Sequence, residues 1–117
     1  AIEIGAEITS IGRYAFSHLY EVKSIVFAEG SKVEKIDVTG FYYDFNVTAI
    51  VLPETVRSIG VLAFGNQYAL KELYVPQGVS EIGANAFKSC RNLTLNVAEG
   101  TYAETYAKEN NIPYTTR

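Results

Sequence analysis

The hydrophobic residues of this 117-residue chain recur with a period of about 23 residues, which is typical of repeat architectures. The segment 56–78, VRSIGVLAFGNQYALKELYVPQG, serves as a template, and the segment 79–100 repeats its Ile-Gly, Ala-Phe and terminal Gly one residue shorter. The segment 33–55 keeps the spacing, and 8–32 keeps the motif with two extra residues. Residues 1–7 align with the end of a unit. The sequence therefore predicts a solenoid over residues 1–100, with four full repeats and one partial repeat.

Alignment of the repeats places apolar residues in columns that we expect to face one core. Three columns run through all four repeats: Ile11, Ile36, Ile59 and Ile82; Phe16, Phe41, Phe64 and Phe87; and Val22, Val47, Leu70 and Leu93. Near the end of each repeat two apolar residues alternate with other residues, as a strand buried on one side requires: Ile25/Phe27, Ile50/Leu52, Leu73/Val75 and Leu95/Val97. Each repeat thus predicts one strand. A short extended piece should precede each Ile of the first column, and the following x-x-Ala-Phe segment should form one helical or 3₁₀ turn.

Residues 101–117 are predicted to cover the C-terminal end, because a single repeat cannot bury its own apolar edge. Thr101 and Glu104 have the spacing of a capping box that opens a helix over residues 102–110. Its apolar side is expected to consist of Tyr102, Tyr106, Ile112 and Tyr114. The sequence shows no matching cover at Ala1. Unless upstream repeats cover it, the edge strand with Ile2 and Ile4 is therefore expected to allow edge-to-edge self-association through the uncapped N-terminus.

The motif I-G-x-x-A-F-x-x-C-x-x-L, seen in IGANAFKSCRNL and followed by a strand and Pro as in LKELYVP, resembles the BspA-type leucine-rich repeat family. The tail TYAETYAKENNIPY resembles an ending common in that family. The resemblance covers the whole chain and implies an α/β fold, a right-handed leucine-rich-repeat solenoid with strands along one curved face. It also implies a secreted or cell-surface location, usually within a larger bacterial or protist surface protein, and a role in adhesion. The family fixes no catalytic residues.

The second repeat departs from the pattern, because Asp37 replaces the glycine that follows the Ile column. If the glycines of the other repeats adopt positive φ, Asp37 must do so too, and Asp tolerates that conformation better than most residues. We therefore expect left-handed or distorted backbone at residue 37. If residue 37 has ordinary dihedral angles, the glycines of this column serve close packing instead. These glycines are Gly12, Gly60 and Gly83.

Composition and charge narrow the range of functions. The chain has 10 basic and 13 acidic residues, a formal charge of -3 and no long run of Lys or Arg, which argues against nucleic-acid binding. No apolar run approaches the roughly 18 residues of a membrane span. The single cysteine, Cys90, cannot form an internal disulfide. No phosphate-binding Gly-rich loop occurs, so we expect no cofactor.

Two surfaces are candidates for binding. The first is formed by the strand residues that alternate with the buried ones; Val26, Val51 and Tyr74 form its apolar centre, and the outward Glu72 lies next to them. An apolar patch of this kind marks interfaces, although β-propensity alone also explains these residues. The second is the turn after each Phe, where aromatic residues recur at Tyr20, Phe45 and Tyr68, with Tyr42 and Tyr43 beside them. The alternative is that this column only shields the Phe ladder, and solvent exposure decides between the two readings.

Catalysis is not expected from this sequence. His18 and Cys90 lie three repeats apart, which at strand spacing is about 14 Å, whereas a nucleophile and its base need about 3 Å. One His and one Cys also fall short of a metal site, and the carboxylates are scattered over different repeats. Two Asn-x-Thr sequons, at Asn46 and Asn92, matter only if the source glycosylates secreted proteins. We therefore predict a non-catalytic binding module for a protein or cell-surface ligand, with a glycan as a further candidate partner; a structural spacer is the alternative.

Overall fold

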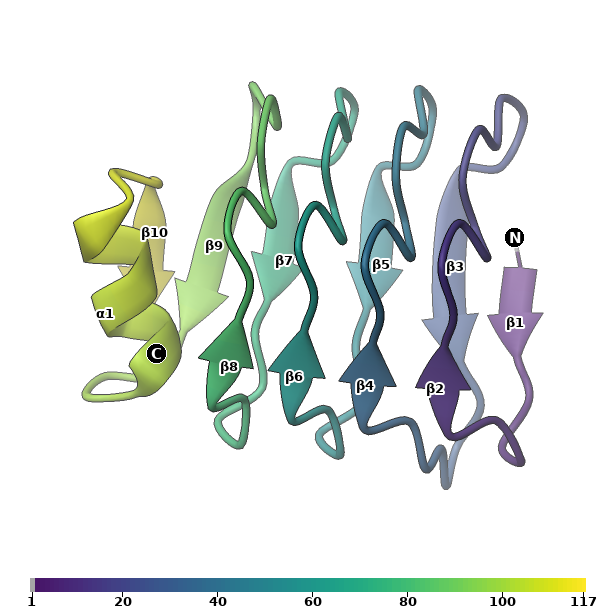
Figure 1. Ribbon diagram of the computed structural model, residues 1–117, viewed down its shortest axis with the longest axis horizontal. Coiled ribbons are helices and arrows are strands. Elements are labelled where there is room, and N and C mark those ends of the chain that lie inside the picture. Colours follow the sequence, from purple (N-terminus) through teal and green to yellow (C-terminus); the bar gives the residue numbers. More distant parts are fainter. Residues whose placement is uncertain (1) are drawn as a thin grey trace.

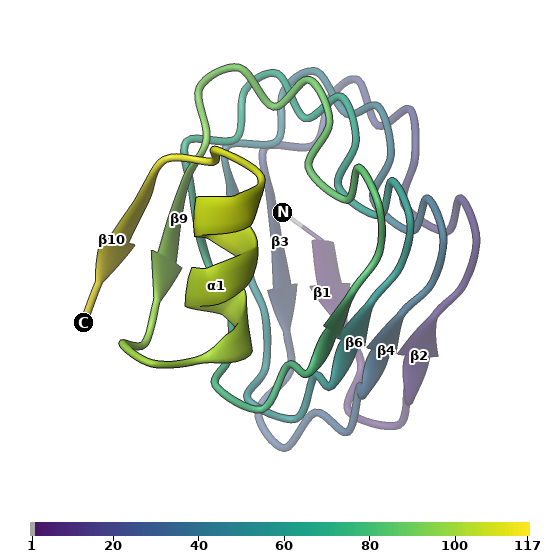
Figure 2. The same ribbon diagram turned by 60° about the vertical axis from the view of Figure 1, so that its left-hand side comes forward.

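The computed structural model describes residues 2–117 as a coil of stacked repeats with two parallel sheets on opposite sides (Figures 1 and 2). Ala1, the first residue of the predicted partial repeat 1–7, lies outside the described residues. The larger sheet has the order β1-β3-β5-β7-β9-β10, with strands Ile2–Ile4, Ser24–Phe27, Ala49–Val51, Glu72–Tyr74, Thr94–Val97 and Tyr114–Thr116. The smaller sheet, β2-β4-β6-β8, is built from Ser10–Ile11, Lys35–Ile36, Ser58–Ile59 and Glu81–Ile82.

The predicted columns form the core. Ile25 pairs with Ile50 across β3 and β5, and Leu73 pairs with Leu95 across β7 and β9. The four ladder Phe rings stack in parallel, with centroids 5.2 to 5.5 Å apart. Because each apolar side chain contacts its equivalents in the next repeats, the core is continuous along the solenoid. The predicted strand near the end of each repeat, with inward residues at alternate positions, is confirmed.

The short extended pieces before the Ile column pair with one another, which the sequence did not predict. Ile11, Ile36, Ile59 and Ile82 lie in register in the smaller sheet. Each strand there has only two residues, too short for a period-two pattern to be recognised. The pairing is possible because stacking brings equivalent segments side by side, as Figure 2 shows.

The x-x-Ala-Phe segments are not helical, and this part of the prediction is wrong. Each segment is a series of turns with two residues in the left-handed region, at φ values from 54° to 67°. These residues are Tyr14, Thr39, Leu62 and Asn85 in one column, and His18, Tyr43, Asn66 and Ser89 in the other. In each repeat that is followed by another, the backbone amides of these residues donate to carbonyl groups of the next repeat. The Tyr14 amide, for example, donates to the Thr39 carbonyl at 3.1 Å. A helix would direct the same amides along its own axis, so bonds between repeats replace bonds within the turn.

The glycine column does not adopt positive φ, and the expectation for Asp37 is also wrong. Only Gly30 and Gly100 among the described glycines have positive φ, and Asp37 is not among the non-glycine residues that do. A Cβ at Gly60 would instead lie 2.6 Å from the Val38 nitrogen and 2.8 Å from the Asp37 carbonyl carbon. The column therefore serves close packing between neighbouring backbones. At Asp37 the carboxylate accepts a hydrogen bond from the Val38 amide at 2.7 Å.

Helix α1 (Tyr102–Glu109) covers the last repeat (Figure 2). Thr101 caps it by accepting from the Glu104 amide at 3.4 Å, while the Glu104 carboxylate reaches back to the Gly100 amide at 2.9 Å. Tyr106 packs edge-on against Phe87, and its hydroxyl donates to the Gly83 carbonyl at 2.9 Å. Of the predicted apolar side, Tyr106 is buried, whereas Tyr102 is 43% exposed. After α1 the chain adds β10 to the edge of the larger sheet, a strand that the sequence did not predict.

Candidate binding surfaces

The strand face, defined here as the outward side chains of β3, β5, β7 and β9, is the first predicted surface. Val26 and Val51 pair across β3 and β5 and are 36% and 63% exposed. Ala49 pairs with Glu72, so Val51 and Tyr74 lie on adjacent strands. Glu72 is exposed, and Tyr74 is half-buried. The structure thus brings together the four residues predicted for this surface.

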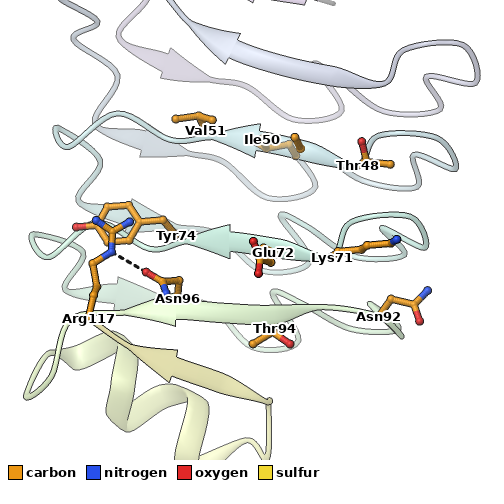
Figure 3. Close-up of a pocket in the computed structure, with 11 residues that line it drawn as sticks. Thr48, Ile50, Val51, Lys71, Glu72, Tyr74, Asn92, Thr94, Asn96 and Arg117 are labelled. Carbon is orange, nitrogen blue, oxygen red and sulfur yellow. Dashed lines mark hydrogen bonds between the residues drawn. The ribbon is translucent and has the colours of Figure 1, made fainter.

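A groove crosses the strand face over β5, β7 and β9 (Figure 3). Its floor is formed by strand side chains, and its ends carry longer polar side chains. The lining residues are Thr48, Ala49, Ile50, Val51, Lys71, Glu72, Tyr74, Asn92, Thr94, Asn96 and Arg117. In Figure 3, Lys71 lies at one end of β7, and Tyr74 with Arg117 lies at the other.

Arg117 and Lys71 are groove residues that sequence reasoning missed, and Arg117 makes the more specific contacts. Its guanidinium carbon lies 3.7 Å from the centroid of the Tyr74 ring, and its Nε donates to the Asn96 side-chain oxygen at 2.6 Å. The Tyr74 hydroxyl donates to Glu54 at 3.3 Å. Burial, followed by the Glu54 charge, raises the pKa of Tyr74, which keeps this hydroxyl protonated and able to donate. No pattern in the sequence could place Arg117 here, because β10 was not expected.

The aromatic column, defined as Tyr20, Phe45 and Tyr68, is stacked, and two of its three rings are exposed while Tyr68 is half-buried. Neighbouring ring centroids are 5.5 Å apart with interplanar angles of 15° and 16°. Arg91 continues the column, with its guanidinium carbon 5.4 Å from the Tyr68 centroid. Tyr20 is 55% exposed and Phe45 is 38% exposed, so a binding role for the column survives this test.

The neighbouring rings extend the aromatic column sideways. His18 stacks on Tyr43 at 5.2 Å, and Tyr43 meets Phe45 edge-on at 5.0 Å. Tyr42 contacts Tyr43 at 5.6 Å, and both tyrosines are half-buried. Stacking between repeats occupies ring faces in the column. A sugar ring, which packs flat on an aromatic face, therefore finds few free faces here.

Comparison with known proteins identifies the repeat. The family model for the BspA type leucine-rich repeat region matches residues 1–111 with six copies. The chain belongs to this family. A leucine-rich repeat protein from Bacteroides ovatus is similar in structure, with a TM-score of 0.52 and 25% sequence identity. The match covers 82% of this chain and 33% of the Bacteroides protein, so the chain spans about a third of its length. No functionally curated protein matches the chain.

Membership of the BspA-type family agrees with the predicted leucine-rich-repeat solenoid and with a fold commonly used for protein interaction. The family is associated with bacterial surface or secreted proteins. Within residues 2–117, no helix is long and apolar enough to cross a bilayer.

A polar column, formed by Asp44, Gln67 and Cys90, runs behind the turns of this BspA-type solenoid. Asp44 accepts from the Leu19 amide at 2.8 Å and from the Gln67 side-chain nitrogen at 3.0 Å. That nitrogen also donates to the Phe41 carbonyl, and the Cys90 thiol donates to the Phe64 carbonyl at 2.8 Å. The side chains therefore tie each repeat to the one before it.

Asp44 is fully buried, and burial raises the pKa of its carboxyl from the ordinary value of 3.8, partly offset by its hydrogen bonds to Leu19 and Gln67. Because the folded-state pKa is the higher one, the native protein binds a proton at a pH where the unfolded chain is still ionised. The free energy of unfolding therefore gains a contribution that is fully present below pH 3.8 and is lost as the pH rises through the folded-state pKa.

The candidate nucleophile and base are far from any catalytic arrangement. His18 packs among Tyr20, Tyr42 and Tyr43 in the first full repeat, whereas Cys90 lies in the fourth. Burial raises the pKa of the Cys90 thiol to about 11, so the thiol remains protonated and serves as a donor. No group of three or more His, Cys, Asp or Glu within residues 2–117 could hold a metal ion.

Both sequon asparagines have a role within the repeat. The Asn46 side-chain nitrogen donates to the Tyr20 carbonyl, and that of Asn92 donates to the Tyr68 carbonyl at 3.1 Å. Each bond joins one repeat to the preceding one at the same column. Hydrogen bonding to the backbone of the preceding repeat therefore explains why asparagine stands at both positions.

Proposed function

We propose that this chain is a non-catalytic binding module of a secreted or cell-surface protein, and that it mediates protein–protein contact or cell adhesion through the strand face. The observation that carries the proposal is the groove over β5, β7 and β9, with the exposed Val51 in its lining. An apolar side chain left 63% exposed among polar groups gives a partner apolar area to cover. The extracellular location rests on the family association.

The aromatic column is a second surface for the same function. The exposed rings of Tyr20 and Phe45, with Arg91 at the end of the column, present rigid area that loses little entropy on contact. Because most ring faces are stacked on one another, this geometry favours a protein over a glycan. A spacer without a ligand is the alternative to both surfaces.

The experiment compares the 117-residue chain with two single variants in binding to cell-surface proteins and to a glycan array. Val51→Asp places a charge in the groove, and Val61→Asp places one at a valine 40% exposed beyond β6, on the side of the smaller sheet. We expect Val51→Asp to abolish binding and Val61→Asp to leave it unchanged. Equal binding by all three proteins would eliminate the strand face, and Phe45→Ala would then test the aromatic column.

Self-association through β1 is a further proposal. Within the described residues β1 is an edge of the larger sheet and pairs only with β3, and an unpaired edge can accept another strand. Sedimentation over a range of concentrations tests this proposal. We expect a dimer that Glu3→Pro disrupts, and a monodisperse monomer at high concentration would refute it.

A further inference from the structure

We propose that Arg117 is a carboxylate-binding residue of the groove, and that the partner of the groove is an extended protein segment with acidic side chains flanking an apolar one. This inference rests on the proposed function and specifies the chemistry of its ligand. It depends on three features: the fixed orientation of Arg117, the donors that this orientation leaves free, and the distribution of charge along the groove.

The guanidinium of Arg117 is held in place by three contacts. Its plane lies over the Tyr74 ring at 3.7 Å, its Nε donates to Asn96 at 2.6 Å, and its backbone amide donates to the Val97 carbonyl at 3.1 Å. Tyr74 is itself anchored through its hydroxyl to Glu54. A side chain with few remaining rotamers loses little entropy when a ligand binds, so this arginine is preorganised.

The same contacts leave the terminal nitrogens of Arg117 available. Among residues 2–117, the only side-chain acceptor of this guanidinium is Asn96, which takes the Nε donor. The two Nη groups still carry donors in the planar fork that matches both oxygens of a carboxylate. Lysine would supply the charge without this fork, and a neutral residue would supply neither.

The charges along the groove favour a peptide with two separated carboxylates. Lys71 and Arg117 stand at opposite ends of the groove in Figure 3, and Glu72 lies between them. The lining carries a net charge of +1 on a chain whose formal charge is -3, and the Glu54 carboxylate, outside the lining, is held on the Tyr74 hydroxyl. From Lys71 to Tyr74 the strand advances about 10 Å, a distance that an extended segment of about four or five residues covers.

The centre of the groove argues against a polyanion and for a mixed segment. Glu72 is exposed there and would repel a continuous row of phosphates or sulfates, while it can accept a hydrogen bond from a hydroxyl or an amide of a peptide. Val51 on the neighbouring strand offers the apolar contact. Acidic ends and an apolar or hydroxyl-bearing middle therefore complement this surface.

The test uses a library of random seven-residue peptides displayed on phage and selected on the immobilised 117-residue chain. Peptides that bind the wild type and not Val51→Asp are groove binders. Their dissociation constants are then measured on Arg117→Gln, on Arg117→Lys and on the control Lys35→Gln, which removes an exposed cation of β4 in the smaller sheet. Circular dichroism melting verifies that each variant is folded.

We expect groove binders to be enriched in Asp and Glu, to bind Arg117→Gln about fivefold more weakly, and to be unaffected by Lys35→Gln. Arg117→Lys should also bind more weakly than the wild type, because it lacks the planar fork. Groove binders without acidic residues, or with the same affinity for Arg117→Gln, would overturn this inference and leave the proposed function standing. The absence of any groove binder would overturn both this inference and the proposed binding role of the strand face.

Discussion

The packing role of the glycine column makes Gly60→Ala a sharp test of the solenoid's geometry. The added Cβ would lie 2.6 Å from the Val38 nitrogen, whereas ordinary contact begins near 3.4 Å. The neighbouring repeat would have to move by about 0.8 Å. The atoms in the way belong to the backbone, so a rotamer change cannot relieve the collision.

The cost of this shift can be worked out from the structure. The hydrogen bond from the Gly60 amide to the Ile36 carbonyl is 2.8 Å long, and a shift of this size would break it, a loss of about 1 kcal/mol. Overpacking adds about 1–3 kcal/mol, and the lower entropy of the unfolded alanine chain offsets about 0.4–1 kcal/mol. The net loss is about 1–3.6 kcal/mol, which lowers Tm by about 4–14 °C for a domain of this size.

Gly12→Ala is the matched control, because it changes the same column where a Cβ would meet nothing within 4 Å. We expect this variant to be as stable as the wild type, or slightly more stable through the unfolded-state effect. Thermal and urea unfolding followed by circular dichroism would measure both variants. If Gly60→Ala lost no more stability than Gly12→Ala, close packing would not explain the glycine column.

Three further predictions concern the polar column and the cap. Burial raises the pKa of Asp44 because it opposes the charged form of the carboxylate. Asp44→Asn should therefore stabilise the protein at pH 7 and weaken the rise of its unfolding free energy with falling pH. Urea titrations at pH 4 and pH 7 would measure this, and an unchanged pH dependence would contradict it. Cys90, with a pKa of about 11, should react with iodoacetamide at pH 8 about 100-fold more slowly in the folded than in the unfolded protein; equal rates would mean that the thiol is not buried. Thr101→Ala should cost about 1 kcal/mol by removing the N-cap of α1, and Thr105→Ala, on the exposed side of the same helix, is the control that should leave the unfolding midpoint nearly unchanged.

The inward half of the structure was predictable from the sequence because its cause is local. Ile11 and its equivalents, and the Phe ladder, recur at fixed offsets, and a residue that must fill the same space in every repeat keeps the same type. The cap was predictable for a similar reason, since Thr101 and Glu104 carry a capping signal within four residues. The capping signal can be read without comparing the repeats.

The turns could not be predicted, because the partners of their backbone groups lie in other repeats. The Leu62 amide donates to the Ala84 carbonyl, a residue 22 positions away in the sequence, and Leu62 adopts φ 56° although it is neither Gly nor Asn. Local propensity assigns such a residue to ordinary backbone. The bonds between repeats outweigh that preference, and they also explain why the glycines, whose role is packing, show no positive φ in this column.

The binding surface was predictable only in outline, and the reason follows from the repeat itself. Inward positions of the strands carry the same kind of residue in every repeat, because one core constrains them all. The outward positions are free of that constraint and differ from strand to strand, as Val51, Tyr74 and Asn96 do at a single column. Arg117 follows β10, a strand outside the repeat pattern, and its side chain reaches Tyr74 and Asn96 in this column. The groove therefore lies where the periodicity ends, and only the three-dimensional arrangement of these four side chains shows that they line it together.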